Sequence, residues 1–339
     1  MPHLHSDDCW LPAGCLADLP AADTAAREAL AARAGDILRP AGAFARLDEA
    51  AIWLAGWQGR PDPDVRRPSV LILAGDHGVA ADGTVSAYPT EVTAAMVAAF
   101  NADRSTVNAL ARRAGATVHV IDLGVGAPCG DIRSTDAVSV PRAREIVAEV
   151  TAHVDQLDTD LLVIGEMGIG NTTPAAAVVT ALLGGSAAEW TGPGTGVDPS
   201  AGKVAAVEAA VARVAEEADP LEVLRRIGGS ELVGMAAACL AARRRGIPVL
   251  LDGYVVTAAL LPLEAAQPGA LDHCFAGHAS PEPGHRRLLE HLDRQPLLDL
   301  GLRLGEASGA MAAVPLLAMA CAALTEVPTF AEWFGHAPQ

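Results

Sequence analysis

The sequence predicts an α/β fold, in which helices flank a parallel, Rossmann-like sheet and a smaller helical domain lies beside it. Two observations lead to this prediction. Between residues 69 and 284, short apolar runs alternate with longer stretches of helical periodicity, which is typical of βαβ units. Residues 1–60 and 285–339 carry helical patterns alone. We therefore expect a large α/β domain at 69–284 and a small domain built from both ends of the chain.

The helices of the small domain are expected at residues 24–34 and 42–57, where apolar residues recur at helical spacing between charged ones. A proline-punctuated linker, residues 60–68, separates them from the α/β segment. Two further helices are expected near the end of the chain, at residues 286–291 and 305–324.

Four apolar runs are expected to form the sheet, at residues 70–74, 117–121, 161–165 and 248–251. The helices between them are expected to include residues 91–113, 174–183, 203–217 and 230–245. Acidic residues and glycines follow every run, beginning with Asp76, Asp122, Glu166 and Asp252. Because open parallel sheets bind ligands at the carboxyl ends of their strands, we expect the active site at that edge.

Composition restricts the class of protein. The 339 residues are 51% hydrophobic, enough for a large core, and the formal charge of −17 argues against nucleic acid as the partner. Six cysteines without CxxC spacing indicate reduced thiols in a cytoplasmic protein.

Two uncharged runs, 167–188 and 307–325, approach membrane-spanning length. Both are rich in small residues and contain a proline, so we expect buried core helices and no membrane span.

The segment after the third expected strand has the character of an anion site. Gly168 and Gly170 allow close approach of the backbone to a ligand, while Asn171, Thr172 or Thr173 is expected to cap the following helix. A helix start presents free N–H groups and a positive dipole end. The alternative is a glycine turn that serves packing alone.

A second glycine-rich loop, residues 191–198, precedes Lys203. Two loops rich in N–H groups and one nearby lysine suit a single phosphate monoester. Lys203 as a solvated surface residue is the alternative.

Two polar segments have a less specific pattern. Asp76 and His77 could bind a metal, but the chain supplies no matching ligand spacing, so a structural or substrate-lining role is favoured. Residues 278–285 form a polar, proline-rich turn that resembles a plain connection. The absence of a GxSxG motif disfavours a serine hydrolase.

Glu306 lies between glycines at the expected start of a long, uncharged helix. The carboxylate could simply compensate the helix dipole. Partly desolvated in a glycine-lined pocket, it would instead have a raised pKa and accept a proton near neutrality.

Taken together, these segments resemble the nicotinate-nucleotide:dimethylbenzimidazole phosphoribosyltransferase (CobT) family from about residue 69 to 332. The motifs that carry the resemblance occur in the family's order, at residues 74–79, 85–89, 165–173, 194–196, 252–254, 257–259, 282–285 and 297–309.

The resemblance implies transfer of 5-phosphoribosyl from nicotinate mononucleotide to 5,6-dimethylbenzimidazole or a related base. The products would be nicotinate and α-ribazole 5′-phosphate, used in cobalamin lower-ligand synthesis. Glu306 matches the family's catalytic base, and Glu166 matches a second acid in the same pocket. A homodimer is implied, and neither a metal nor another cofactor is needed, because the donor carries only a monophosphate.

The implied substrate-binding residues fall into three groups. Those expected at the 5′-phosphate are Gly168, Ile169, Gly170, Asn171, Thr172, Gly194, Thr195, Gly196 and Lys203. Ser280 would contact the nucleotide. Ser86, Tyr88 and Leu304 match positions that line the base pocket, and Gly305 adjoins them.

Three segments, 82–86, 103–108 and 197–203, depart from the family pattern. The first two lie on the base-binding side, so a paralogous phosphoribosyltransferase or nucleosidase with another acceptor stays an alternative. A non-catalytic nucleotide-binding regulator is the second alternative, and the presence of Glu306 weighs against it.

Overall fold

The computed structural model describes residues 9–12, 14–193 and 201–335. Its centre is a five-stranded sheet of order β2-β1-β3-β4-β5, in which every pair of neighbours is parallel. The strands are β1 (Pro68–Ala74), β2 (Thr117–Asp122), β3 (Leu161–Met167), β4 (Val249–Leu251) and β5 (Cys274–Ala276). The predicted parallel α/β fold is therefore confirmed. Of the strands in the described residues, β5 alone was not predicted.

The central strands β1 and β3 are buried along their full length, as expected of parallel strands that helices cover on both faces. Successive side chains of β1 enter opposite cores. Leu71 and Leu73 pack into one apolar cluster, and Val70 and Ile72 pack into the other. A nearly continuous apolar run therefore specifies a strand between two helical layers.

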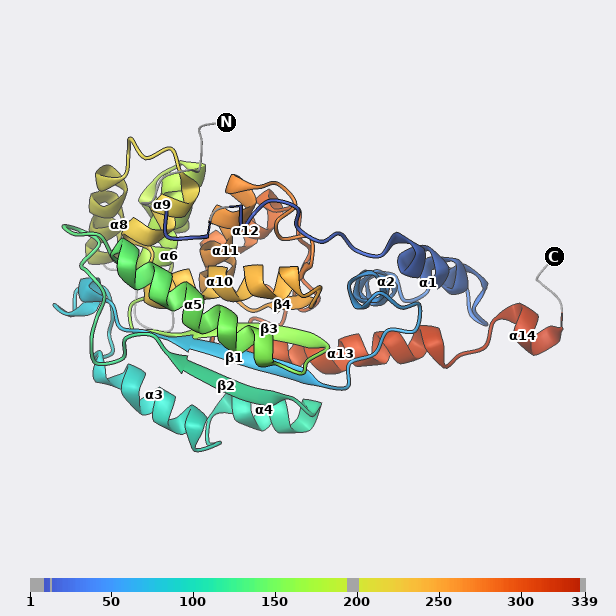
Figure 1. Ribbon diagram of the computed structural model, residues 1–339. Helices are drawn as coiled ribbons and strands as arrows, with labels where there is room; N and C mark the ends of the chain where they lie inside the picture. Colours follow the sequence, from blue (N-terminus) through green and yellow to red (C-terminus); the bar gives the residue numbers. More distant parts are fainter. Residues whose placement is uncertain (1–8, 13, 194–200, 336–339) are drawn as a thin grey trace.

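Helices form a layer on each face of this sheet. Figure 1 shows α5 (Val140–Gln156) and α10 (Ser230–Arg244) on one face, and α3 (Glu91–Asn101) and α4 (Thr106–Ala114) on the other. The first layer continues through α6 (Thr172–Leu183), which contacts α11. The other helices are α1 (Thr24–Asp36), α2 (Arg46–Gln58), α7 (Ala187–Trp190), α8 (Ala201–Arg213), α9 (Pro220–Ile227), α11 (Tyr254–Ala266), α12 (Pro283–His291), α13 (Ser308–Thr325) and α14 (Phe330–Phe334).

The expected single helix at 91–113 is wrong, since the structure has two helices there. Asp103 adopts a left-handed φ of 56°. Ser105 then caps α4 by accepting the backbone N–H of Asn108, whose side chain in turn accepts the N–H of Ser105. The polar segment between the helices thus ends one and starts the next.

Helix α13 connects the terminal helices to the sheet. It contacts α1 and α2, but also α4 and β3. Figure 1 shows α1 and α14 on the side of the molecule away from α6 and α8. The division into a large and a small domain stays a prediction.

Residues 308–325 alone, among the described residues, form a helix with the length and hydropathy of a membrane span. More than half of that stretch is buried in the protein. Its contacts with α2, α4 and β3 fit the expected core helix.

Candidate active site

A cavity of about 770 Å³ opens at the carboxyl ends of the central strands. It contains every predicted site residue that the structure describes: Ser86, Tyr88, Glu166, Gly168, Ile169, Gly170, Asn171, Thr172, Lys203, Ser280, Leu304, Gly305 and Glu306. Gly194, Thr195 and Gly196 lie outside the described residues. The cavity thus brings together residues from distant parts of the chain.

Glu166 is the penultimate residue of β3 and is buried. Burial raises the pKa of its carboxyl group to about 8; a hydrogen bond from the Asn171 amide opposes this, and the charges of Asp252, Glu231 and Glu306 add to it. Glu166 is therefore mostly protonated at neutral pH. Asn171 occupies the N-cap position of α6, one of the three expected, but its side chain makes no capping hydrogen bond, and its Nδ2 donates to Glu166 Oε2 instead.

Glu306 does not lie in a helix, contrary to expectation. Glu306 and Ala307 both have left-handed φ angles, 60° and 63°, and α13 begins only at Ser308. Glu306 is only 7% exposed. Burial, followed by the nearby charge of Asp252, raises the pKa of its carboxyl group to about 7. A group with this pKa can accept a proton at neutral pH.

Two glycines let β3 and the Glu306 segment approach closely. A Cβ atom on Gly165 would lie 2.5 Å from the backbone nitrogen of Ala307. A Cβ atom on Gly305 would lie 2.7 Å from Glu166 Oε1. Side chains at either position would separate the two acids, so these glycines determine how closely Glu166 and Glu306 approach.

Asp252 and His278 form a buried pair near Glu306, after β4 and β5. Asp252 Oδ1 lies 3.3 Å from His278 Nε2. Within the described part of the chain, neither ring nitrogen of His278 has a hydrogen-bond partner, although the residue lines the cavity. Sequence reasoning missed His278, because its polar turn gave no sign of the contact with Asp252.

His285 hydrogen-bonds to Ser280, and these contacts determine which ring nitrogen of His285 carries the proton. The backbone N–H of Ser280 donates to His285 Nδ1 at 3.0 Å. The proton therefore resides on Nε2, which donates to Thr257 Oγ1 at 3.1 Å, and that hydroxyl donates to the carbonyl of Gly253. Burial, together with the charge of His278, lowers the pKa of His285 to about 3. A neutral imidazole thus orients the turn that carries Ser280.

Lys203 provides positive charge at one end of the cavity. Its Nζ donates to Thr172 Oγ1, to Gly192 O and to Pro193 O, each at 3.3 Å. Burial lowers the pKa of the ammonium group, and the charge of Glu282 opposes that shift. Lys203 is the only lysine of the chain. With the N-terminus of α6, it forms an environment suited to an anion.

Another part of the cavity wall is more apolar. Ser86 Oγ accepts the backbone N–H of Tyr88 at 3.1 Å, and the side chains of Tyr88 and Leu304 are partly exposed. Val92 and Met96 of α3 complete this wall and were not predicted. Helical apolar spacing is the signal of both core and cavity residues, so it could not separate them.

Asp76 and His77 do not line the cavity, so the substrate-lining alternative is wrong. His77 Nε2 lies 2.5 Å from Glu231 Oε1 in a fully buried pair. Asp76 Oδ2 accepts the backbone N–H of Gly126 at 2.7 Å. Both side chains support the loops that surround the site.

The chain is similar to known proteins over most of its length. A family model described as phosphoribosyltransferase matches residues 19–333. A nicotinate-nucleotide–dimethylbenzimidazole phosphoribosyltransferase of Mesorhizobium japonicum is 49% identical, over 98% of both chains. One from Methylorubrum extorquens is 47% identical, over 92% of both.

Solved structures extend the likeness to three dimensions. The crystal structure of CobT from Thermus thermophilus has a TM-score of 0.86 and 38% identity, covering 91% of this chain and 98% of its own. Sequence and fold thus lead to one assignment. The chain belongs to the nicotinate-nucleotide–dimethylbenzimidazole phosphoribosyltransferase family.

Proposed function

We propose that the protein transfers 5-phosphoribosyl from nicotinate mononucleotide to 5,6-dimethylbenzimidazole or a related base. The products are nicotinate and α-ribazole 5′-phosphate, a precursor of the cobalamin lower ligand. The observation that carries this proposal is Glu306, a buried carboxylate with a pKa of about 7 in a cavity lined both by Lys203 and by apolar side chains.

The phosphate of the donor binds beside Lys203. The backbone of residues 168–172 and the ammonium group of Lys203 provide donors and charge there. Lys203 would exchange its three hydrogen bonds to protein oxygens for bonds to phosphate oxygens. Ser280, oriented by His285, contacts the nucleotide. Gly194, Thr195 and Gly196 belong to this proposed phosphate site by family resemblance.

The acceptor base binds against the apolar part of the wall. A benzimidazole is flat and largely apolar, and it suits the wall formed by Tyr88, Met96 and Leu304. Ser86 is placed to meet a polar edge of the base. The base nitrogen that attacks then faces the ribosyl carbon, while the opposite N–H faces Glu306.

Proton transfer occurs on the acceptor side only. Glu306 takes the N–H proton of the base as the other ring nitrogen forms a bond to C1′. The bond from C1′ to the pyridinium nitrogen of nicotinate breaks, and its electron pair neutralises that ring. The leaving group therefore needs no general acid, and attack from the opposite face inverts C1′ to the α configuration.

Glu166 supports the base through its protonation state. Two ionised carboxylates in one small site would repel each other, and the raised pKa of Glu166 avoids this at neutral pH. Protonated Glu166 orients Glu306, and on ionising it stabilises the positive charge that develops on the ribosyl carbon.

The remaining parts of the proposal concern the setting of the enzyme. We expect a cytoplasmic homodimer that acts on these small molecules without nucleic acid. The net charge of −17 supports the last point, because binding a polyanion requires a basic surface.

The test is an assay of the purified chain with nicotinate mononucleotide and a panel of bases. Mass spectrometry follows nicotinate release and the nucleotide products, and 5,6-dimethylbenzimidazole is expected to give α-ribazole 5′-phosphate. Ribose 5-phosphate as the sole product would identify a nucleosidase, and preference for another base would identify another acceptor. No nicotinate release with any base would refute the transferase.

A further inference from the structure

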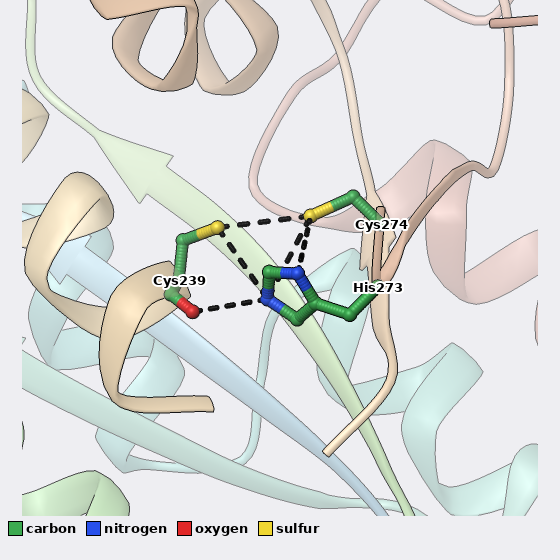
Figure 2. A group of neighbouring side chains, drawn as sticks. All are labelled: Cys239, His273 and Cys274. Carbon is green, nitrogen blue, oxygen red and sulfur yellow. Dashed lines mark hydrogen bonds between the residues drawn. The ribbon is translucent and has the colours of Figure 1, made fainter. Parts of the chain in front are cut away.

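Three side chains that bind soft metals meet at the end of the sheet opposite the cavity. Figure 2 shows Cys239 of α10 facing His273 and Cys274, of which the latter is the first residue of β5. All three are fully buried. None of them takes part in the proposed reaction, so the cluster needs an explanation of its own.

The ligand atoms already have nearly the separations that one shared ion requires. The two sulfur atoms are 3.6 Å apart. His273 Nε2 lies 3.7 Å from Cys239 Sγ and 3.9 Å from Cys274 Sγ. Cys274 Sγ is also 3.7 Å from Nδ1, so the imidazole has to turn to direct Nε2 at a shared ion. With Zn–S bonds of about 2.3 Å and Zn–N bonds of about 2.0 Å, ligand atoms on a tetrahedral zinc ion are separated by about 3.5–3.8 Å.

We propose that Cys239, His273 and Cys274 bind one zinc ion. Two thiolates neutralise the divalent charge, so the loaded site carries no net charge in the protein core. Binding releases the two thiol protons to solvent and requires His273 to give up its 3.0 Å hydrogen bond to the carbonyl of Cys239. That carbonyl oxygen lies beside the imidazole, where it can serve as a fourth ligand.

The surroundings exclude water and place two guanidinium groups close to the cluster. The edge of the Trp57 ring packs on His273 at 5.8 Å between centroids, and Arg243 lies over the same indole at 4.3 Å. Arg294 Nη1 donates to the carbonyl of Cys274.

The expected role is structural. A zinc ion here would tie α10 to the first residue of β5, 35 positions further along the chain. Strand β5 ends at Ala276, shortly before His278, which lines the cavity. A site closed by Trp57 leaves no open coordination position for a substrate, as is typical of structural zinc.

The experiment measures zinc directly. The full-length chain is kept reduced, loaded with Zn²⁺, freed of excess metal and examined by elemental mass spectrometry. One zinc per chain is expected. Cys239→Ala and Cys274→Ala should each lose it, whereas Cys321→Ala, which removes a buried cysteine of α13 outside the cluster, should keep it.

A second measurement avoids variants that fail to fold. Cobalt substitution of the wild-type chain should give the near-ultraviolet absorption of thiolate-bound Co²⁺. A reduced wild-type chain that retains no metal overturns the proposal, as does equal retention by Cys239→Ala. A mass loss of two hydrogens from a Cys239–Cys274 disulfide in the native protein would also overturn it. These readouts do not depend on turnover, so they stand apart from the test of the proposed function.

Discussion

Asp252 Oδ1 accepts a hydrogen bond from the backbone N–H of Ala310 at 2.8 Å. The carboxylate after β4 thereby satisfies one of the free N–H groups in the first turn of α13. The same helix follows Glu306, whose pKa the charge of Asp252 raises. One side chain thus both positions the proposed base and adjusts its affinity for a proton.

Asp252→Asn should shift the pH profile of the reaction. The amide oxygen can still accept the Ala310 N–H, but the negative charge is gone, so the pKa of Glu306 falls. The acid limb of kcat/KM should move to lower pH. Asp158→Asn, a change of an exposed acid outside the cavity, should leave the limb in place. An unshifted limb in Asp252→Asn would show that its charge does not act on the base.

Glu306→Gln should lower kcat by about 10²–10⁴-fold, the usual contribution of a positioned base. Binding of nicotinate mononucleotide should remain close to that of the wild type, because the proposed phosphate site lies elsewhere in the cavity. Steady-state rates and calorimetric titration measure the two effects. Near-normal turnover would make Glu306 a structural residue.

Glu166→Gln should change how stability depends on pH. The folded pKa of about 8 exceeds the ordinary 4.5, so the protonated group stabilises the fold fully below pH 4.5 and this contribution is lost as the pH rises through 8. The wild type should therefore lose on the order of a few kcal/mol more than Glu166→Gln between about pH 5 and 8.5. Thermal unfolding at both pH values measures this, with Glu326→Gln, an exposed acid, as the control. Parallel losses in all three proteins would contradict the assignment.

Lys203→Met should raise the KM for nicotinate mononucleotide by about 10–100-fold, since a hydrogen bond to a charged group contributes about 1.5–3 kcal/mol. The KM for the base should change little, because the base is proposed to bind against Tyr88, Met96 and Leu304 and not against the ammonium group. Initial rates at varied donor and acceptor concentrations separate the two constants. Equal changes in both would place Lys203 outside the phosphate site.

Gly309→Ala should destabilise the fold by about 1–3 kcal/mol, the usual cost of overpacking. The added Cβ would lie 2.2 Å from His278 Nε2 inside the core. Gly35→Ala in α1 has open space and should be neutral or stabilising by up to about 1 kcal/mol. Denaturant unfolding compares the two variants, and equal stability would refute the predicted clash.

The sequence predicts those strands and loops whose conformation is determined by a local residue pattern. The long apolar runs of β1 and β3 define central parallel strands, and the glycines after β3 indicate a ligand loop. Glu306 was assigned to a helix because its neighbours have helical composition. In the structure, Glu306 and Ala307 both have left-handed backbone conformations, and Ala307 packs closely on Gly165. That contact joins segments far apart in the sequence, so no local pattern reveals it.

His278 was missed for a related reason. Its polar turn has the composition of an ordinary connection, and only the folded chain places it between Asp252 and Gly309. The same holds for Cys239 and Cys274, whose spacing in sequence matches no familiar metal motif.

The chain carries 24 basic residues, of which Lys203 is the single lysine. The other basic residues are arginines, and the compact ammonium group of Lys203 lies between Thr172 and the carbonyls of Gly192 and Pro193. This lysine is therefore a site for selective chemical labelling. A reagent that acylates side-chain amines has one target in the whole chain, and that target lies inside the cavity.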